Sequence, residues 1–310
     1  MKKFALIPYV LFLGFIIVFF ACNQTNKQTN NNETILKGST YILVDETLLP
    51  IIEDQVEVFE SLYAGSKIKV IAKSEAETVL ALSKDTSKIA ILSRKLNPEE
   101  EKVFESKKIT PRTTVFAIDA IAFISNKRNK DTLVALQDVV DFMKGKSNSN
   151  IKGLVFDNPN SSTVRYMNKL SGLKEMPSKG IFSFKTNEEV IQFVSENDGM
   201  IGIVGVNWLM QPSLKMRPIV DKVNLISVKG IDKTAYYAPT QNNLAEGKYP
   251  LARDLYIVNC QGYSGLGMGF ASFIAGDIGQ RIILKSGLLP IKMPGRNIKT
   301  RKQLENKNKY

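Results

Sequence analysis

Hydroxyl and carboxyl groups carry most of the chemistry available to this chain, because its 310 residues include no histidine. Histidine is the commonest general base and the commonest metal ligand in proteins. Its absence excludes every Ser/His/Asp and Cys/His catalytic set, and Cys260 lies in an apolar, strand-like run that is typical of a buried thiol. We therefore expect a binding protein rather than an enzyme, with no metal site and no cofactor.

A polar turn, Asn160-Ser161-Ser162-Thr163, comes directly before an apolar helical pattern. Such a turn is a good helix N-cap, because its side-chain oxygen atoms accept hydrogen bonds from free backbone N–H groups. The same N–H groups, together with the positive end of the helix dipole, also bind anions. The turn by itself favours the cap, and a role in an anion site depends on residues elsewhere in the chain.

The N-terminus has the pattern of an export signal. Two lysines precede an apolar run, residues 4–20, which ends at Ala21 and Cys22. These features resemble a bacterial lipoprotein signal. We expect cleavage to remove residues 1–21 and acyl chains such as palmitate to be attached to Cys22, so that the protein is anchored to a membrane of the cell envelope with its folded part in the periplasm. A transmembrane anchor is the alternative, since the run is close to the length that spans a bilayer.

Both ends of the remaining chain are polar. Residues 22–35 predict a flexible leash, and residues 299–310 form a basic tail. The net charge of +12 suits a membrane surface or an anionic ligand, although dispersed lysines more often form a solvated face. Export disfavours nucleic acid as a partner.

Between these ends, strand patterns alternate with helical patterns. The first part has strands at 40–44, 67–72 and 88–92 and helices at 48–62, 75–82 and from residue 98 onward. This order predicts an α/β fold with a mainly parallel, helix-covered sheet. A long apolar stretch, residues 113–126, could cross between two lobes. The pattern then restarts, with helices at 133–143, 164–170 and 187–196, strands at 153–156, 200–204 and 249–258, and one last helix face from 270 to 284.

Seven segments resemble motifs of the periplasmic phosphate-binding proteins of ABC transporters, within the type II solute-binding superfamily. They occur in the family's order and are Ser93–Glu100, Ala117–Asn126, Leu136–Gly145, Asn160–Thr163, Gly199–Gly205, Tyr249–Tyr256 and Gly279–Pro290. The resemblance implies a two-lobed α/β fold joined by crossing strands, with lobe 1 made of residues 36–118 and 236–298 and lobe 2 of residues 119–235. It also implies a monomer that captures a small oxyanion, phosphate by default, for an inner-membrane permease.

The resemblance further implies a ligand set, because the family holds phosphate with backbone N–H and hydroxyl groups at helix starts. Carried over to this chain, those positions are Thr47, Leu48, Ser74, Ser93, Ser161, Ser162 and Thr163. Asp157 stands where the family has a ligand arginine. Arg94 replaces an aspartate that accepts a hydrogen bond from protonated phosphate in the family. If Asp157 limits phosphate affinity, Asp157→Arg should strengthen binding.

Four further acids, Asp45, Glu46, Glu75 and Glu77, lie in the first two loops of the expected cleft. Glu75 and Glu77 could point to solvent at a helix start, where acids suit the dipole. Acids that faced the cleft would repel a dianion, which suits an amino- or metal-bearing ligand instead. A third hypothesis is a non-transport interaction or sensor protein that docks on a membrane complex.

Overall fold

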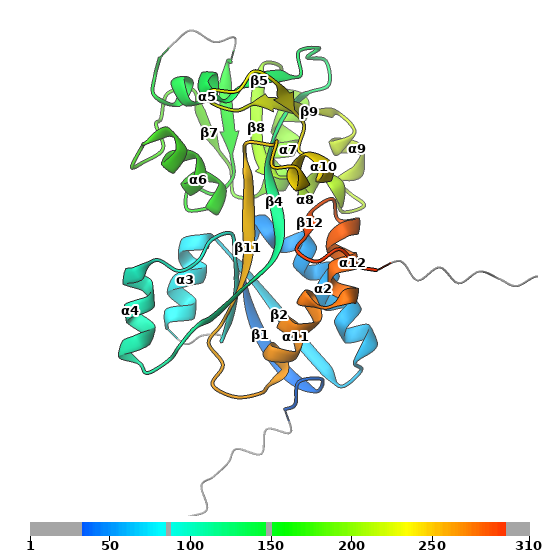
Figure 1. The fold of residues 1–310 in the computed structure, drawn as a ribbon. Helices are drawn as coiled ribbons and strands as arrows, with labels where there is room; N and C mark the ends of the chain where they lie inside the picture. The colour runs from blue at the N-terminus through cyan, green and yellow to red at the C-terminus, as the bar shows by residue number, and fades with distance from the viewer. Residues whose placement is uncertain (1–32, 85–87, 147–150, 296–310) are drawn as a thin grey trace, which may run out of the picture. The chain divides into compact units, whose positions relative to one another are not determined.

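The computed structural model describes residues 33–84, 88–146 and 151–295 (Figure 1). The chain divides into Met1–Glu33 and Thr34–Tyr310, and every helix and strand below belongs to the second unit. The predicted signal peptide, Cys22, most of the leash and the basic tail lie outside the described residues, so these predictions stay open. Within the described ranges, no helix is long and apolar enough to cross a membrane.

The first group of elements, which we call lobe 1, contains three parallel strands. They lie in the order β2-β1-β3 and are β1 (Gly38–Asp45), β2 (Ser66–Lys73) and β3 (Ile89–Leu92). All four residues of β3 are buried. A continuous apolar strand of this kind is expected where helices cover both faces of a parallel sheet.

Helices cover both faces of the lobe 1 strands. Figure 1 shows one face covered by α3 (Glu75–Ser83) and α4 (Pro98–Ser106), and the other by α2 (Leu49–Leu62), α11 (Leu266–Ala275) and α12 (Asp277–Lys285). The predicted apolar face of α2 is confirmed at Ile51, Ile52, Val56 and Phe59, which are all buried, but not at Leu62, which is exposed in the last turn. Pro50 lies in the first turn, where its missing N–H costs no hydrogen bond.

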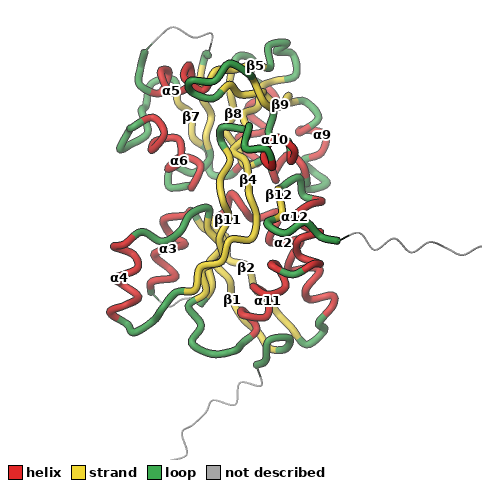
Figure 2. Tube along the Cα trace, in the orientation of Figure 1, coloured by secondary structure: helices red, strands yellow, loops and turns green. Residues whose placement is uncertain are grey.

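Two long strands connect lobe 1 with the second group of elements. These are β4 (Arg112–Asn126) and β11 (Ala252–Asn259), which pair antiparallel with each other. Figure 2 shows both strands passing continuously between the two groups of helices. The first part of β4 pairs with β11, and Ile121–Ile124 then pair with β8 in the second group. The predicted crossing over residues 113–126 is therefore confirmed.

The second group, which we call lobe 2, is built on the parallel strands β8, β6 and β7. Their bounds are β6 (Gly153–Phe156), β7 (Ile181–Ser183) and β8 (Met200–Gly205). The helices and remaining strands of this group are β5 (Leu133–Ala135), α5 (Leu136–Met143), α6 (Ser162–Ser171), α7 (Asn187–Glu196), α8 (Asn207–Met210), α9 (Arg217–Val220) and β9 (Val223–Lys229). After β9 the chain forms β10 (Tyr236–Tyr237) and α10 (Gln241–Ala245), and the fold ends with β12 (Leu289–Pro290), which pairs with β4.

The structure corrects three predicted elements. The helix expected from residue 133 begins at Leu136, because residues 133–135 form β5 and pair with β9, a strand that sequence patterns missed. The strand expected from Tyr249 begins at Ala252. The single last helix is two helices, since Gly276 adopts an extended conformation between α11 and α12. The two-lobed α/β fold is as predicted, whereas the lobe boundaries near residues 118 and 235 stay predictions.

Candidate functional site

The predicted site residues follow the carboxyl ends of four parallel strands. Asp45 ends β1, and Thr47 follows it in a short 3-10 helix, Glu46–Leu48; Ser74 follows β2 and caps α3, which begins at Glu75. Ser93 follows β3, while Asp157 and the polar turn follow β6. Ligands of open α/β sheets bind at this edge, because helices begin there and direct free N–H groups toward it.

Hydroxyl groups from the two lobes meet directly. Thr47 Oγ1 lies 2.9 Å from Ser162 Oγ, although 115 residues separate the two along the chain. Both residues are fully buried. The Trp208 indole N–H also donates to the Thr47 carbonyl oxygen at 3.0 Å. Thr47 and Ser162, both predicted from the resemblance, therefore lie together on the line where the lobes touch.

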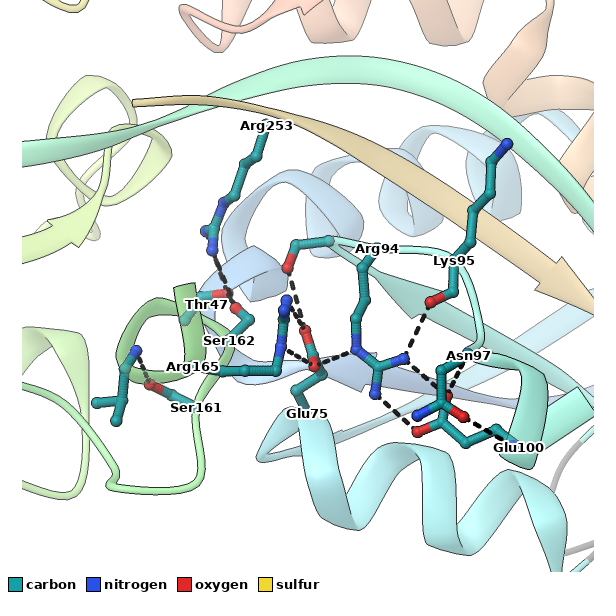
Figure 3. A network of polar contacts seen from close by, with 12 residues as sticks. Thr47, Glu75, Arg94, Lys95, Asn97, Glu100, Ser161, Ser162, Arg165 and Arg253 are labelled. Carbon is teal, nitrogen blue, oxygen red and sulfur yellow. Dashed lines mark hydrogen bonds and ion pairs between the residues drawn. The ribbon is translucent and has the colours of Figure 1, made fainter. Parts of the chain in front are cut away.

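Arg253 is a candidate site residue that the sequence interpretation missed. It lies on β11, is 5% exposed, and donates to Ser162 Oγ at 3.0 Å and to Thr47 Oγ1 at 3.4 Å (Figure 3). Its Nε atom donates to Asp119 Oδ2 at 2.9 Å. The sequence signal was an arginine within the mainly apolar segment Tyr249–Tyr256. That signal does not reveal which residues the arginine side chain contacts. Arg253 thus places a positive charge beside hydroxyl groups of both lobes.

Asp119 holds this guanidinium from the middle of the crossing strand β4. Burial raises the pKa of the Asp119 carboxyl, and the charge of Arg253 opposes that shift. Burial also disfavours the charged form of Arg253, but Asp119 and Asp45 outweigh it and raise the pKa of the guanidinium. The pair therefore keeps a buried arginine charged and oriented.

Glu75 forms a second polar cluster with two arginines and a serine. Its carboxylate accepts hydrogen bonds from Arg94 Nε at 2.7 Å, from Arg165 Nη2 at 2.9 Å and from Ser93 Oγ at 3.2 Å. Arg165 Nε makes a further bond to it. Figure 3 shows Arg94 and Arg165 approaching Glu75 from opposite sides. The expectation that Glu75 points to solvent is therefore wrong, since the residue is 1% exposed.

The charge partners of Glu75 decide its protonation. Burial raises the pKa of this carboxyl, but hydrogen bonds and charges from Arg165 and then Arg94 outweigh burial and lower the pKa below its ordinary value. Arg94 is also bound by Glu100 through two hydrogen bonds, of 2.7 and 2.8 Å. Glu75 is consequently ionised at neutral pH.

Asp157 lies in a different environment, with neutral donors at both oxygen atoms. Oδ1 accepts from Ser161 Oγ at 2.5 Å, and Oδ2 accepts from Asn187 Nδ2 at 3.1 Å. Burial raises the pKa of Asp157 to about 7, and the nearby charge of Asp45 adds to that effect. Ser161 in turn accepts from Val164 N at 3.2 Å, which confirms the predicted N-cap of α6.

Asp45 has a carboxylate oxygen without a partner. Oδ1 accepts from Thr47 N at 3.2 Å, whereas Oδ2 is buried and has no hydrogen-bond partner among the described residues. Burial and the charge of Glu75 raise the pKa of Asp45 to about 6, against opposing effects of Arg253 and the Ser162 hydroxyl. A buried acceptor without a donor is costly, and a ligand that donates a hydrogen bond would remove that cost.

The remaining predicted residues have other contacts. The Leu48 side chain is buried in the apolar core, so its backbone alone is left for a ligand. Ser74 Oγ donates to Glu77 Oε2 at 2.7 Å in a capping box, and Glu77 is exposed as the solvent hypothesis expected. Thr163 is buried, and its hydroxyl has no partner in the described part of the chain.

A cavity of ≈ 360 Å³ lies beside these clusters. Its wall includes Ser93, Arg94, Arg165, Lys169 and Arg253. Guanidinium groups bind carboxylates and phosphates through charge-assisted, often paired hydrogen bonds. The described residues contain no group of three or more His, Cys, Asp or Glu side chains placed to hold a metal ion. The arrangement is thus suited to a small oxyanion.

Comparison with known proteins agrees with the fold. Residues 29–277 match the PBP superfamily domain, and the chain belongs to this family. The phosphate-binding protein PstS of Borreliella burgdorferi is 25% identical over 303 residues, which cover 91% of this chain and 99% of that protein.

Two solved structures share the fold. A substrate-binding protein assigned to a phosphate ABC transporter of Clostridium perfringens, with bound phosphate, has a TM-score of 0.69 at 20% identity and covers 82% of this chain and 100% of its own. An ABC-type phosphate transport receptor from Vibrio cholerae has a TM-score of 0.62 at 18% identity, with coverage of 82% and 100%. Identities this low establish a shared fold. They do not identify the ligand contacts of this chain, which have to be argued from its own geometry.

Proposed function

We propose that this chain is a solute-binding protein that captures a tetrahedral oxyanion, with phosphate as the first candidate, between its two lobes for an ABC-type uptake system. The observation that carries the proposal is Arg253, a buried guanidinium in contact with hydroxyl groups of both lobes. Membership in the solute-binding family and the phosphate-binding relatives support it.

In this proposal, Arg253 supplies the positive charge that a ligand arginine supplies in the family at the position of Asp157. An anion at the line between the lobes would receive two charge-assisted hydrogen bonds from the Arg253 guanidinium, with Thr47 and Ser162 as further donors. The backbone N–H groups of Ser162 and Thr163 lie in the first turn of α6, where helices leave N–H groups unpaired. Ser93 and Arg94 would reach the anion from the adjacent cavity wall.

Binding requires the lobes to separate. The 2.9 Å between Thr47 Oγ1 and Ser162 Oγ is a hydrogen-bond distance and leaves no space for a ligand between these atoms. An anion that enters replaces this direct contact by contacts of its own to each hydroxyl. Asp45 Oδ2 would accept a hydrogen bond from a protonated ligand oxygen, since it is buried and makes no hydrogen bond of its own within the described residues.

Calorimetric titration and thermal scans with phosphate, arsenate, sulfate and molybdate test the proposal. A ligand at a hundredfold excess over its dissociation constant should stabilise the protein by about 2.7 kcal/mol. Arg253→Gln should abolish the effect, while Arg128→Gln, which removes an exposed arginine of lobe 2, should leave it unchanged. If none of the anions stabilises protein that has been shown to be free of ligand, the proposal fails.

An amino- or metal-bearing ligand is the second candidate. The buried carboxyl groups of Asp45, Asp119 and Asp157 favour it, because each of the first two has an oxygen atom without a hydrogen-bond partner in the described ranges. A mass spectrum of small molecules released on denaturation would identify an organic cation or a metal. Release of nothing, together with no binding, would support an interaction or sensor protein that docks on a membrane complex.

We further propose that acylated Cys22 anchors a periplasmic, monomeric protein to the membrane, and that a permease complex is its partner. Cys22→Ser should abolish lipid attachment and leave an uncut or soluble species. Unchanged mass and unchanged membrane extraction of the variant would contradict the anchor.

A further inference from the structure

Glu75 is bound in the way that an anionic ligand would be bound. Its two carboxylate oxygens accept hydrogen bonds from Ser93, Arg94 and Arg165, and the residue is 1% exposed. These three donors also form part of the wall of the ≈ 360 Å³ cavity next to Arg253. The donors most suited to an oxyanion are therefore already occupied by a side chain of the protein itself.

The cluster also joins the two lobes. Glu75 begins α3 in lobe 1, and Arg165 lies on α6 in lobe 2, 90 residues further along the chain. Arg94 belongs to lobe 1 and keeps Glu100 as a second carboxylate partner. Arg165 is the donor that crosses, and its side chain is 36% exposed. Breaking the contact between Glu75 and Arg165 thus frees Arg165 to follow its own lobe, while Arg94 stays paired.

We propose that the Glu75 carboxylate is an intramolecular anion, which occupies the donors of Ser93, Arg94 and Arg165, holds the lobes together, and must be displaced by the anion that the protein captures. The inference rests on the proposed function, because it specifies what the incoming ligand competes with. Glu75 is thereby the residue that sets affinity and selects among anions.

Competition with a carboxylate defines the class of anion that succeeds. A carboxylate offers two acceptor oxygens and one negative charge, whereas a tetrahedral dianion such as hydrogen phosphate offers more acceptors and a larger charge. Simple carboxylates such as acetate bring nothing that Glu75 does not already supply at a high effective concentration. Occupied donors lower the apparent affinity for every anion in proportion to the fraction of molecules in which they are free.

Glu75→Gln tests the proposal, with Glu99→Gln as the matched control. Glu99 lies exposed in the first turn of α4, so both variants lose one negative charge from lobe 1, but only Glu75 contacts the cavity donors. Glu75→Gln should bind phosphate about tenfold more tightly in calorimetry, because one charged competitor is gone. Small-angle scattering without phosphate should give a larger radius of gyration for Glu75→Gln than for the wild type, and phosphate should shrink it.

A second variant distinguishes the two proposed roles of Glu75, which are to hold the lobes together and to compete with the ligand for donors. Arg165→Gln removes the donor that crosses and leaves Glu75 bound to Arg94, so it should enlarge the radius of gyration without increasing phosphate affinity. Because the Arg165 side chain is partly exposed, Arg165→Gln should fold even if Glu75→Gln folds poorly, and its radius of gyration can then still be measured.

The outcomes distinguish this inference from the proposed function. Equal or weaker phosphate binding by Glu75→Gln, with wild-type dimensions in both variants, overturns the inference and leaves phosphate binding intact. A larger radius of gyration in both variants would support the contact between the lobes. If neither variant nor the wild type binds phosphate, the proposed ligand is refuted.

Discussion

Glu75 and Asp157 are two buried carboxylates at the same edge of the fold, and their environments are opposite. Glu75 accepts hydrogen bonds from two arginines, and its pKa is lowered despite burial. Asp157 accepts from a serine and an asparagine, and burial raises its pKa to about 7. Burial alone would raise both pKa values. The difference shows that the charge of the donors decides which carboxylate stays ionised.

The two environments imply different roles. Glu75 is a charged group shared between lobes and is exchangeable for another anion. Asp157 is a hydrogen-bond acceptor within lobe 2 that orients Ser161 and the start of α6. By the resemblance, both acids depart from the pattern of the phosphate-binding proteins. Under the proposed competition, Glu75 would act on affinity directly, whereas Asp157 would act on it through the polar turn.

The largest expected effect comes from Arg253, whose charge acts on the carboxyl groups of this region. Arg253→Gln should cost about 3 to 5 kcal/mol of unfolding free energy, because Asp119 is left as a buried charge without its partner. Anion binding should be lost as well. Urea denaturation and calorimetry measure the two effects, and a double variant with Asp119→Asn should recover part of the stability but not the binding. Full stability in the single variant would contradict the buried pair.

The pH dependence of stability distinguishes the two carboxylates. Asp157 has a folded pKa of about 7 against an ordinary 3.8, so the folded state binds its proton more tightly than the unfolded state. Its contribution is complete below pH 3.8 and is lost as pH rises through 7, by about 2 to 3 kcal/mol between pH 5 and pH 8. Asp45, Glu46 and Arg253 are the charged groups that act on it. Asp157→Asn should flatten this part of the profile.

Glu75 should show the opposite trend, since its lowered pKa gives stability that is present above its ordinary pKa of 4.5 and lost as pH falls through the folded value. Denaturation at pH 5 and pH 8 measures the Asp157 effect, and denaturation between pH 5 and pH 3 measures the Glu75 effect, because the pKa of Glu75 lies below 4.5. Asp198→Asn, which removes an exposed partner of Arg128, serves as the control and should change little. Parallel profiles for Asp157→Asn and Glu75→Gln would contradict the comparison.

Asp157→Arg should destabilise the protein rather than create a phosphate clamp. Asp157 is 2% exposed and both of its oxygens are bound, so a longer cation would displace Ser161 and Asn187. The expected loss is at least about 2 kcal/mol by overpacking. Thermal denaturation of this variant measures the loss. A stable variant with tighter phosphate binding would instead support the interpretation from the motif, in which Asp157 limits phosphate affinity.

The smallest effect is expected for Ser161→Ala. Loss of an N-cap costs about 1 kcal/mol, and here Asp157 Oδ1 also loses its donor. Thr186→Ala is the matched control, because Thr186 caps α7 by accepting from Glu189 N at 3.2 Å. Ser161→Ala should cost more than Thr186→Ala in urea denaturation. Equal losses would show that the bond to Asp157 adds nothing.

Local sequence patterns determined much of the fold. The apolar spacing along α2 and the run that forms β4 follow from the periods of helices and strands, and they were predicted correctly. The cap at Ser161 needed only neighbouring residues. The patterns failed where tertiary pairing overrides them, as in β5, which is a strand because β9 lies beside it. Seven ordered motifs identified the family because each is local and their order is preserved.

Only the tertiary structure decided the chemistry between the lobes. Arg253 contacts Thr47 across 206 residues, and Arg165 contacts Glu75 across 90. A carboxylate in a first helical turn looks the same in sequence whether it faces water or a guanidinium. Which of these it faces depends on how two distant helices pack, and that packing determines whether the carboxylate is ionised, buried and shared between the lobes.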